Sequence, residues 1–316
     1  MKQFLLTACL FLSIAISSTA QLGNYGNIIG ADKYAALYYE NDFFTGTDMY
    51  YTQGIRVDVV NPVLRYSPFM LLLPSLSNSS VRYGLSAGQD CFTPTSITSN
   101  AILYGDEPFA GYIYLGHFKV SADNYKKQML TAELDAGAIG SCAECEEEQK
   151  AIHRAVAGNV QPDGWQYQIG TGLMLNYKLR YEKALFADTA INLDAVGQIN
   201  AGTVYDNALA GFALHVGKTQ SYFSSSHSSA FQLYGNFQAW VEGVGYNGTM
   251  QGALFTHNSI YTLPYNQLNH IVLGDSYGIC FSYHKIQIEY YGTRITNEIV
   301  KGLNHGWGHL SIVVFM

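Results

Sequence analysis

Charged residues are scarce in this chain, which limits the kinds of partner it can have. Only 13% of the 316 residues are charged, with 17 lysines and arginines against 24 aspartates and glutamates, and the net charge is −7. Proteins that bind nucleic acid nonspecifically present a basic surface. We therefore expect no nucleic-acid partner.

Long hydrophobic runs are also missing after the first twenty residues. A membrane-spanning helix needs about 18 to 20 consecutive apolar residues, and the nearest candidate, Phe69 to Leu73, stops at Pro74. The mature chain is therefore expected either to be water-soluble or to cross a membrane with strands.

Residues 1–20 have the composition of an export signal. A basic start at Lys2 precedes an apolar run and small residues up to Ala20, which predicts a secretory signal peptide cleaved after Ala20. A lipoprotein box ending at Cys9 is the less favoured alternative, because it leaves almost no apolar core before the cut. Residues 21–316 contain no linker or change of composition and are expected to form one domain.

Cysteine is rare, with five residues in the chain, one of them in the signal. Cys142 and Cys145 form a single CxxC pair in a compartment that permits disulfides. The pair could be a local disulfide, two free thiols or half of a metal site. One CxxC without a second is weak evidence for metal, so a disulfide across the loop or free thiols is the favoured interpretation.

What the chain does contain is tyrosine, 25 residues in all, and repeated two-residue alternation. Leu130, Ala132 and Leu134 alternate with Thr131 and Glu133, and similar patterns recur within 166–178, 191–200, 231–241 and 285–290. Side chains on a strand point alternately to opposite faces. Acidic residues on the second face suit a wet lumen better than the core of a soluble sandwich, and tyrosine suits the interface girdles of membrane barrels.

The pattern predicts an all-β fold, a 12-stranded antiparallel transmembrane β-barrel in the cell outer membrane. An even number of strands suits a closed bacterial barrel. The predicted strands are 33–41, 50–60, 81–90, 110–120, 127–138, 164–179, 187–200, 204–217, 230–243, 269–283, 285–296 and 305–315. With both termini periplasmic, connections 42–49, 91–109 and 139–163 are external. A short helix is expected at 144–157, with Gln149 and His153 on one face.

These external connections carry an ordered set of motifs. The set is Asn41-Asp42, Tyr51-Thr52-x-Gly54, Gln89-Asp90-x-Phe92-Thr93-Pro94, Gly105-Asp106-x-Pro108-Phe109-Ala110-Gly111, Gln149-x-x-x-His153, Trp165-x-x-Gln168 and Thr296-x-Glu298. In this order and over nearly the whole mature chain, it resembles the lipid A 3'-O-deacylase family. The resemblance implies a twelve-stranded outer-membrane barrel. It also implies the activity of a carboxylic ester hydrolase, which removes the 3'-linked acyloxyacyl group of lipid A in the outer leaflet with the help of Ca²⁺.

Residue by residue, the resemblance implies catalytic roles for His153, Asn41, Asp42 and Thr52. It implies a calcium sphere that includes Asp42, Asn41 and Gln149, whose oxygen atoms are the ligands calcium prefers. Ester hydrolysis needs a base for water and a positive centre for the oxyanion, so His153 is expected to be the base. No Gly-x-Ser-x-Gly motif is present to supply a serine nucleophile.

The chain departs from the family pattern in two places. Residues 96–103 contain no basic residue where the enterobacterial member has a basic cluster that could hold phosphate, and Asn159 replaces a glutamate. We therefore expect a less phosphorylated lipid A, or another lipid of the outer membrane, as the substrate. The protein is expected to be a monomer.

Several alternatives remain open at this point. An outer-membrane phospholipase would need a nucleophile that the sequence does not reveal, whereas a porin would conduct ions without hydrolysis, and a structural barrel would do neither. Structural roles are favoured for four rim residues, and His305 and His309 are expected to be a lumen pair rather than a metal site. The four rim residues are Asp90, Asp106, Trp165 and Gln168.

Overall fold

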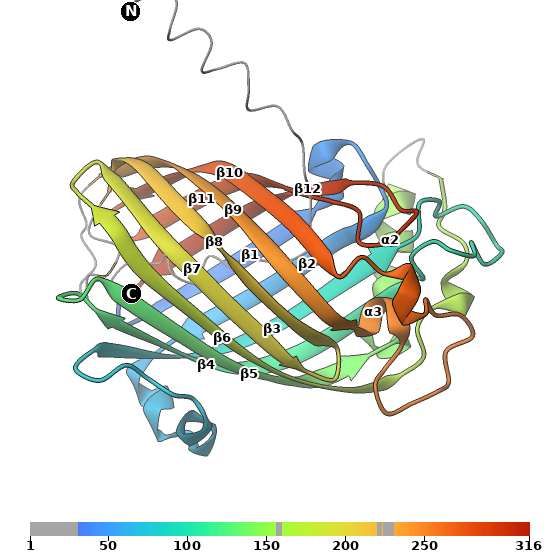
Figure 1. Ribbon diagram of the computed structural model, residues 1–316, viewed down its shortest axis with the longest axis horizontal. Helices are drawn as coiled ribbons and strands as arrows, with labels where there is room; N and C mark the ends of the chain where they lie inside the picture. Colours follow the sequence, from blue (N-terminus) through green and yellow to red (C-terminus); the bar gives the residue numbers. More distant parts are fainter. Residues whose placement is uncertain (1–30, 156–159, 220–222, 224–230) are drawn as a thin grey trace, which may run out of the picture.

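Twelve antiparallel strands close into a barrel in the computed structural model, which describes residues 31–155, 160–219, 223 and 231–316 (Figure 1). Each strand pairs with its neighbours in the chain, and β1 closes the ring against β12, with Tyr34 opposite Phe315. The strands are β1 Tyr34–Asn41, β2 Tyr50–Val60, β3 Ser80–Thr93, β4 Ala110–Asp123, β5 Gln128–Ile139, β6 Gly172–Ala187, β7 Ile191–Gly202, β8 Tyr205–Lys218, β9 Gln232–Asn247, β10 Ile271–Tyr283, β11 Ile286–Ile295 and β12 His305–Phe315. The predicted fold class is confirmed, while the signal peptide at 1–20 lies outside the described residues.

Alternation explains which face of each strand meets lipid. Along β6, Leu173 and Leu175 are exposed on the outer wall, whereas Met174 and Asn176 between them are buried inside the barrel. Closure leaves no unpaired strand edge, which the absence of water in the bilayer requires. The period of two in the sequence therefore reports directly on the two faces of the wall.

The sixth strand is the one whose predicted position is wrong. It was expected at 164–179 and lies at Gly172–Ala187, while Trp165–Tyr167 forms a short 3-10 turn, η5. Gly164 has a positive φ of 101°, a conformation that breaks an extended strand. Trp165 is buried against Phe109, with ring centroids 4.7 Å apart. This part of the sequence therefore packs among the external loops and is not part of the barrel wall.

The two ends of the barrel differ in the length of their connections. One end has tight turns such as 124–127 and 284–285, and the other has the long connections that contain α2 Cys145–Ala155 and α3 Gly248–Gln251 (Figure 1). Short turns mark the periplasmic side of such barrels and long loops the external side. Among the described residues, no helix is both long and apolar enough to cross a membrane.

Side chains fill much of the lumen. Arg56 lies 2.8 Å from Glu133, which also lies 3.4 Å from Lys178, so charges are paired inside the wall. Towards the periplasmic end, an apolar cluster includes Tyr34, Phe118, Met129, Phe223 and Phe315. This cluster, named here the periplasmic plug, joins side chains from several strands with one from the connection between β8 and β9.

Candidate active site

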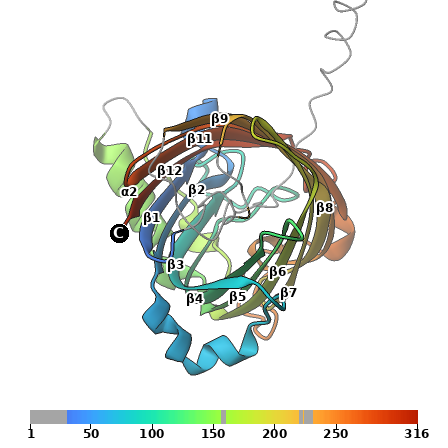
Figure 2. The ribbon, with the colours of Figure 1, turned by 90° about the vertical axis from the view of Figure 1, so that its left-hand side faces the viewer.

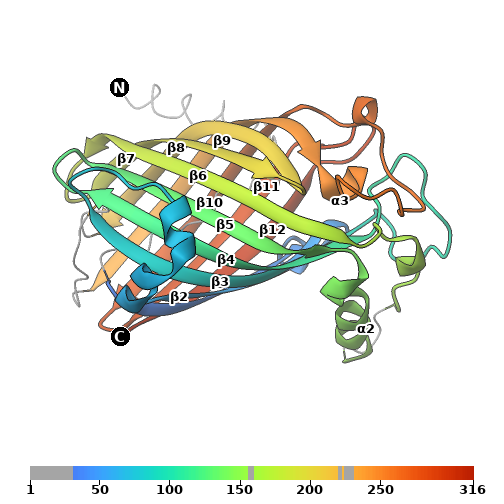
Figure 3. The same cartoon turned by 90° about the horizontal axis from the view of Figure 1, so that it is seen from below.

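The helix α2 stands outside the circle of strands at the external end (Figures 2 and 3). Glu146, Glu147 and Glu148 occupy its first turn and Arg154 its last, an arrangement that suits the helix dipole. The predicted helix at 144–157 is therefore confirmed, at Cys145–Ala155. Its position places its side chains against the outer wall rather than in the lumen.

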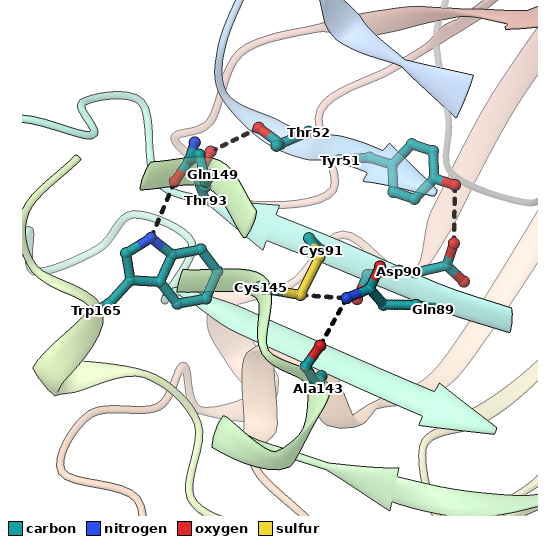
Figure 4. The surroundings of a disulfide bond; sticks show 10 residues. All are labelled: Tyr51, Thr52, Gln89, Asp90, Cys91, Thr93, Ala143, Cys145, Gln149 and Trp165. Carbon is teal, nitrogen blue, oxygen red and sulfur yellow. Dashed lines mark hydrogen bonds between the residues drawn. A yellow bond between two sulfur atoms is a disulfide. The ribbon is translucent and has the colours of Figure 1, made fainter. Parts of the chain in front are cut away.

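A disulfide fixes the start of α2 to the barrel. Cys145 is bonded to Cys91 near the end of β3 (Figure 4), and Gln89 Nε2 donates to Ala143 O at 2.6 Å. Of the alternatives left open for the CxxC pair, a local disulfide is excluded, because Cys145 is bonded to Cys91 and Cys142 is an exposed free thiol. The single CxxC gave no indication of a partner 54 residues away.

Gln149 and His153 share the side of α2 that faces the rim, as their spacing predicted. Gln149 Oε1 accepts from Trp165 Nε1 at 2.9 Å, and its Nε2 donates to Asp48 Oδ1 at 3.1 Å. His153 Nδ1 lies 2.7 Å from Val160 O. Because a carbonyl oxygen can only accept, Nδ1 carries the hydrogen, and Nε2 is the nitrogen that faces Asp48.

Asp48 is the residue at the centre of this network, and the sequence reasoning assigned it no role. Its Oδ2 lies 3.3 Å from His153 Nε2, and its Oδ1 accepts from both Gln149 and Thr52, the latter at 3.3 Å. Burial raises the pKa of Asp48, and the neighbouring His153 opposes that rise. The only sequence signal was its position just before a predicted strand in an external connection.

A β-bulge in β2 brings Thr52 to the same place. The register shifts between Tyr51 and Gln53, since Tyr51 pairs with Phe92 and Gln53 with Cys91. Tyr51 donates to Glu40 inside the barrel at 2.6 Å, whereas Thr52 lies 3.0 Å from Thr93 Oγ1, beside α2 (Figure 4). Bulges redirect side chains in this way and are frequent next to active sites.

Asn41 and Asp42 lie at the start of the short 3-10 helix η1, Asp42–Thr45. The Asn41 side chain caps this helix by accepting from Phe43 N at 2.7 Å, and Asp42 Oδ2 accepts from Met49 N at 2.7 Å. Burial, opposed by the Met49 hydrogen bond and reinforced by the negative charge of Asp48, raises the pKa of Asp42 to about 8. Asp42 is thus joined by its hydrogen bond to the residue that follows Asp48.

The oxygen atoms of these side chains are of the kind that calcium prefers as ligands. The donors are hard oxygen atoms, with two carboxylates, Asp42 and Asp48, that form no ion pair with lysine or arginine in the described part of the chain. The expected ligands are Asn41, Asp42 and Gln149, and the Gln149 oxygen already accepts a hydrogen bond from Trp165 Nε1. Groups of three or more His, Cys, Asp or Glu arranged for metal are not found among the described residues, and the calcium ligands stay a prediction.

The remaining motif residues support the site from a distance or lie elsewhere. Trp165 packs with Phe109 and the disulfide in a buried cluster, and Asp106 accepts from Thr95 at the rim. His305 and His309 are buried in the barrel, where His309 Nδ1 lies 2.6 Å from Glu40. A lumen cavity is lined by Tyr51 and Asp90 but by none of the expected site residues.

Comparison with known proteins identifies similar solved structures and a family. The structure of LpxR from Salmonella typhimurium superposes with a TM-score of 0.71 at 17% identity, covering 90% of this chain and 100% of that one. The β domain of the Bordetella autotransporter BrkA gives a TM-score of 0.49 at 8% identity, covering 91% of this chain and 100% of that one. No curated protein sequence matches. A family described as "Outer membrane protein LpxR" matches residues 4–316, and the chain therefore belongs to the LpxR family of outer-membrane proteins.

Proposed function

We propose that this protein hydrolyses the 3'-linked acyloxyacyl ester of lipid A in the outer leaflet, in a calcium-dependent reaction with His153 as the general base. The observation that carries the proposal is the meeting of His153, Asp48, Gln149 and Thr52 between α2 and the outer wall. Membership of the LpxR family supports it. The ester bond, rather than a phosphate or an amide, is the expected site of attack.

The position of the site favours a lipid that arrives from the side. The network lies outside the strands at the external end, next to Phe43, which is 75% exposed, and Phe44, whose ring packs on outward-facing Tyr290 at 5.8 Å. Apolar side chains beside polar catalytic groups match a molecule with acyl chains and a polar ester. A substrate in the outer leaflet can reach the site without entering the lumen.

The proposed reaction begins with a water molecule placed between His153 and the ester carbonyl. His153 Nε2 takes a proton from this water while the oxygen attacks the carbonyl carbon. Asp48 then stabilises the imidazolium through the contact at 3.3 Å. The tetrahedral intermediate breaks its bond to the 3' oxygen, which takes the proton back from Nε2, so the products are a fatty acid and a sugar hydroxyl.

Calcium would be held by oxygen atoms of Asn41, Asp42, Asp48 and Gln149, and when bound it would supply a Lewis acid that stabilises the oxyanion. Thr52, through its contacts with Asp48 and Thr93, holds the carboxylate in place. Trp165 holds the side chain of Gln149 in place through the hydrogen bond from its Nε1. These contacts orient the groups before substrate arrives, so that little reorganisation is needed in the transition state.

The absence of a basic cluster at 96–103 refines the expected substrate. On α2, Lys150 is engaged with Glu146, and Arg154 is the exposed cation that remains near His153. Fewer cations give weaker binding of phosphate. We therefore propose a lipid A that carries fewer phosphate groups than the enterobacterial form.

The test is mass spectrometry of lipid A after incubation with the purified full-length protein. Three proteins are compared, each with calcium and with chelator: wild type, His153→Ala, and His257→Ala as a control at an exposed external histidine. Loss of one acyloxyacyl unit is expected with calcium from wild type and His257→Ala only. Both mono- and bisphosphorylated lipid A are supplied, and the monophosphorylated form is expected to react faster.

Two outcomes would contradict the proposal. Unchanged lipid A after incubation with wild type and calcium would contradict the deacylase activity. Activity of His153→Ala equal to that of wild type would contradict the role of His153 as the base. The same samples contain phospholipid, so release of lysophospholipid instead would favour the phospholipase alternative.

A further inference from the structure

The connection between β2 and β3 is an exception to the short turns at the periplasmic end. Residues 61–79 contain two 3-10 helices, η2 Pro62–Tyr66 and η3 Pro68–Leu72. They leave the rim and lie across the outer wall rather than over the lumen (Figures 2 and 3). This segment, residues 62–73, is named here the wall segment; it contains the short apolar run that is too short to span a membrane.

One side of the wall segment is fixed firmly to the barrel. Met70 and Leu73 are buried against Ala132 on the outward face of β5. Lys119 Nζ donates to Met70 O at 2.8 Å and to Leu73 O at 2.6 Å, and Tyr177 OH donates to Leu72 O at 2.8 Å. The segment is therefore held firmly against the wall, and its carbonyl oxygens accept hydrogen bonds from Lys119, an outward-facing charge on β4.

The other side of the wall segment is apolar and exposed. Leu71 is 89% exposed, Tyr66 72%, Val63 62% and Leu72 58%. The patch continues into the lipid-facing wall through Tyr83, Leu134 and Tyr177, which pack against the segment. Exposed apolar patches of this kind mark interaction surfaces.

Charge and aromatic groups on the patch indicate what covers it. Arg65 lies at the edge of the patch, with its guanidinium 4.6 Å from the Tyr66 ring. Tyrosine and arginine at the edge of an apolar face occupy the boundary between acyl chains and headgroups, where the cation reaches phosphate. The wall segment lies at the periplasmic end, so the adjacent lipid is phospholipid of the inner leaflet.

We propose that the wall segment is an in-plane anchor that binds phospholipid of the periplasmic leaflet, with Leu71 among the acyl chains and Arg65 at the phosphate. The observations that carry the proposal are the continuity with the lipid-facing wall and the exposed apolar side chains. Short amphipathic elements bind at the membrane interface in the same way. The anchor fixes the height of the barrel in the bilayer and does not depend on the proposed hydrolase activity.

The test places a tryptophan on the exposed side of the anchor. Leu71→Trp and Tyr125→Trp, a control in an exposed periplasmic turn, are reconstituted as full-length proteins in phosphatidylethanolamine and phosphatidylglycerol vesicles. The emission of the wild type, which has three tryptophans, is subtracted. Brominated acyl chains should quench most of the added emission from Leu71→Trp and little from Tyr125→Trp, whereas aqueous iodide should do the reverse.

Two results would overturn the proposal. Quenching of Leu71→Trp by iodide and not by brominated lipid would show that the patch faces water. Protection from both quenchers would show that protein, such as a second copy of the chain, covers it. Because Leu71 is almost fully exposed, the substitution does not disturb the packing of the segment.

Discussion

Replacement of Asp48 by asparagine tests whether this carboxylate acts through His153. The substitution keeps size and hydrogen-bonding capacity but removes the charge 3.3 Å from Nε2. At an effective dielectric constant of about 20, two unit charges at this separation interact by about 5 kcal/mol. The Asp48 side chain is 34% exposed, and solvent screening reduces the expected loss to roughly 2 kcal/mol, or about 30-fold in rate.

The loss should fall on kcat, because the imidazolium exists in the transition state and not in the resting enzyme. The assay is the initial rate of acyl release from lipid A at saturating calcium, with the calcium concentration for half-maximal rate measured separately. Asp188→Asn, in an exposed periplasmic turn, is the control for the charge change and should match the wild type. Circular dichroism checks that each variant folds.

A double-mutant cycle decides the matter. If Asp48 acts through the imidazole, Asp48→Asn should cost little of the residual rate that long incubation at high enzyme concentration detects in the His153→Ala background. The same factor in both backgrounds, or a single variant within about twofold of wild type, would refute the reasoning.

Substitutions of the disulfide, of Trp165 and of Thr52 test how the site is held. Replacing Cys91 and Cys145 together by serine should loosen α2 and lower the rate of acyl release. Limited proteolysis would detect the loosening as faster cleavage, and an unchanged cleavage pattern would show that other contacts hold α2 in place. Trp165→Phe removes the donor to Gln149 Oε1 and should lower kcat by about fivefold, the value of one hydrogen bond of about 1 kcal/mol; a wild-type rate would mean that Gln149 needs no such support. Thr52→Val should cause a similar loss while Thr52→Ser retains the rate, and equal rates for the two variants would contradict a role for the hydroxyl.

Much of the fold could be predicted because the wall obeys a local rule. Lipid outside and polar groups inside give every strand a period of two, as Leu173, Met174 and Leu175 show along β6. The rule fails at Trp165, where apolar residues pack under external loops and resemble the start of a strand. Only contacts with distant loops distinguish the two situations.

The site was predictable where residues lie on one local element and hidden where they do not. Gln149 and His153 are four residues apart on α2, so their common face follows from helix geometry. Asp48 and the partner of Cys145 depend on which strand ends are neighbours in the closed barrel. A single aspartate before a strand carries no pattern of its own, and neither does a cysteine 54 residues from its partner.

The periplasmic plug has a consequence for the cell rather than for the substrate. Tyr34, Phe118, Met129, Phe223 and Phe315 form an apolar cluster on one side of the lumen, and a hydrated ion or nutrient would lose water on entering this cluster. The proposed active site does not require an open pore, because it lies outside the ring of strands. We therefore expect the reconstituted barrel to conduct ions poorly, so that many copies could stand in the outer membrane without opening its barrier to salts.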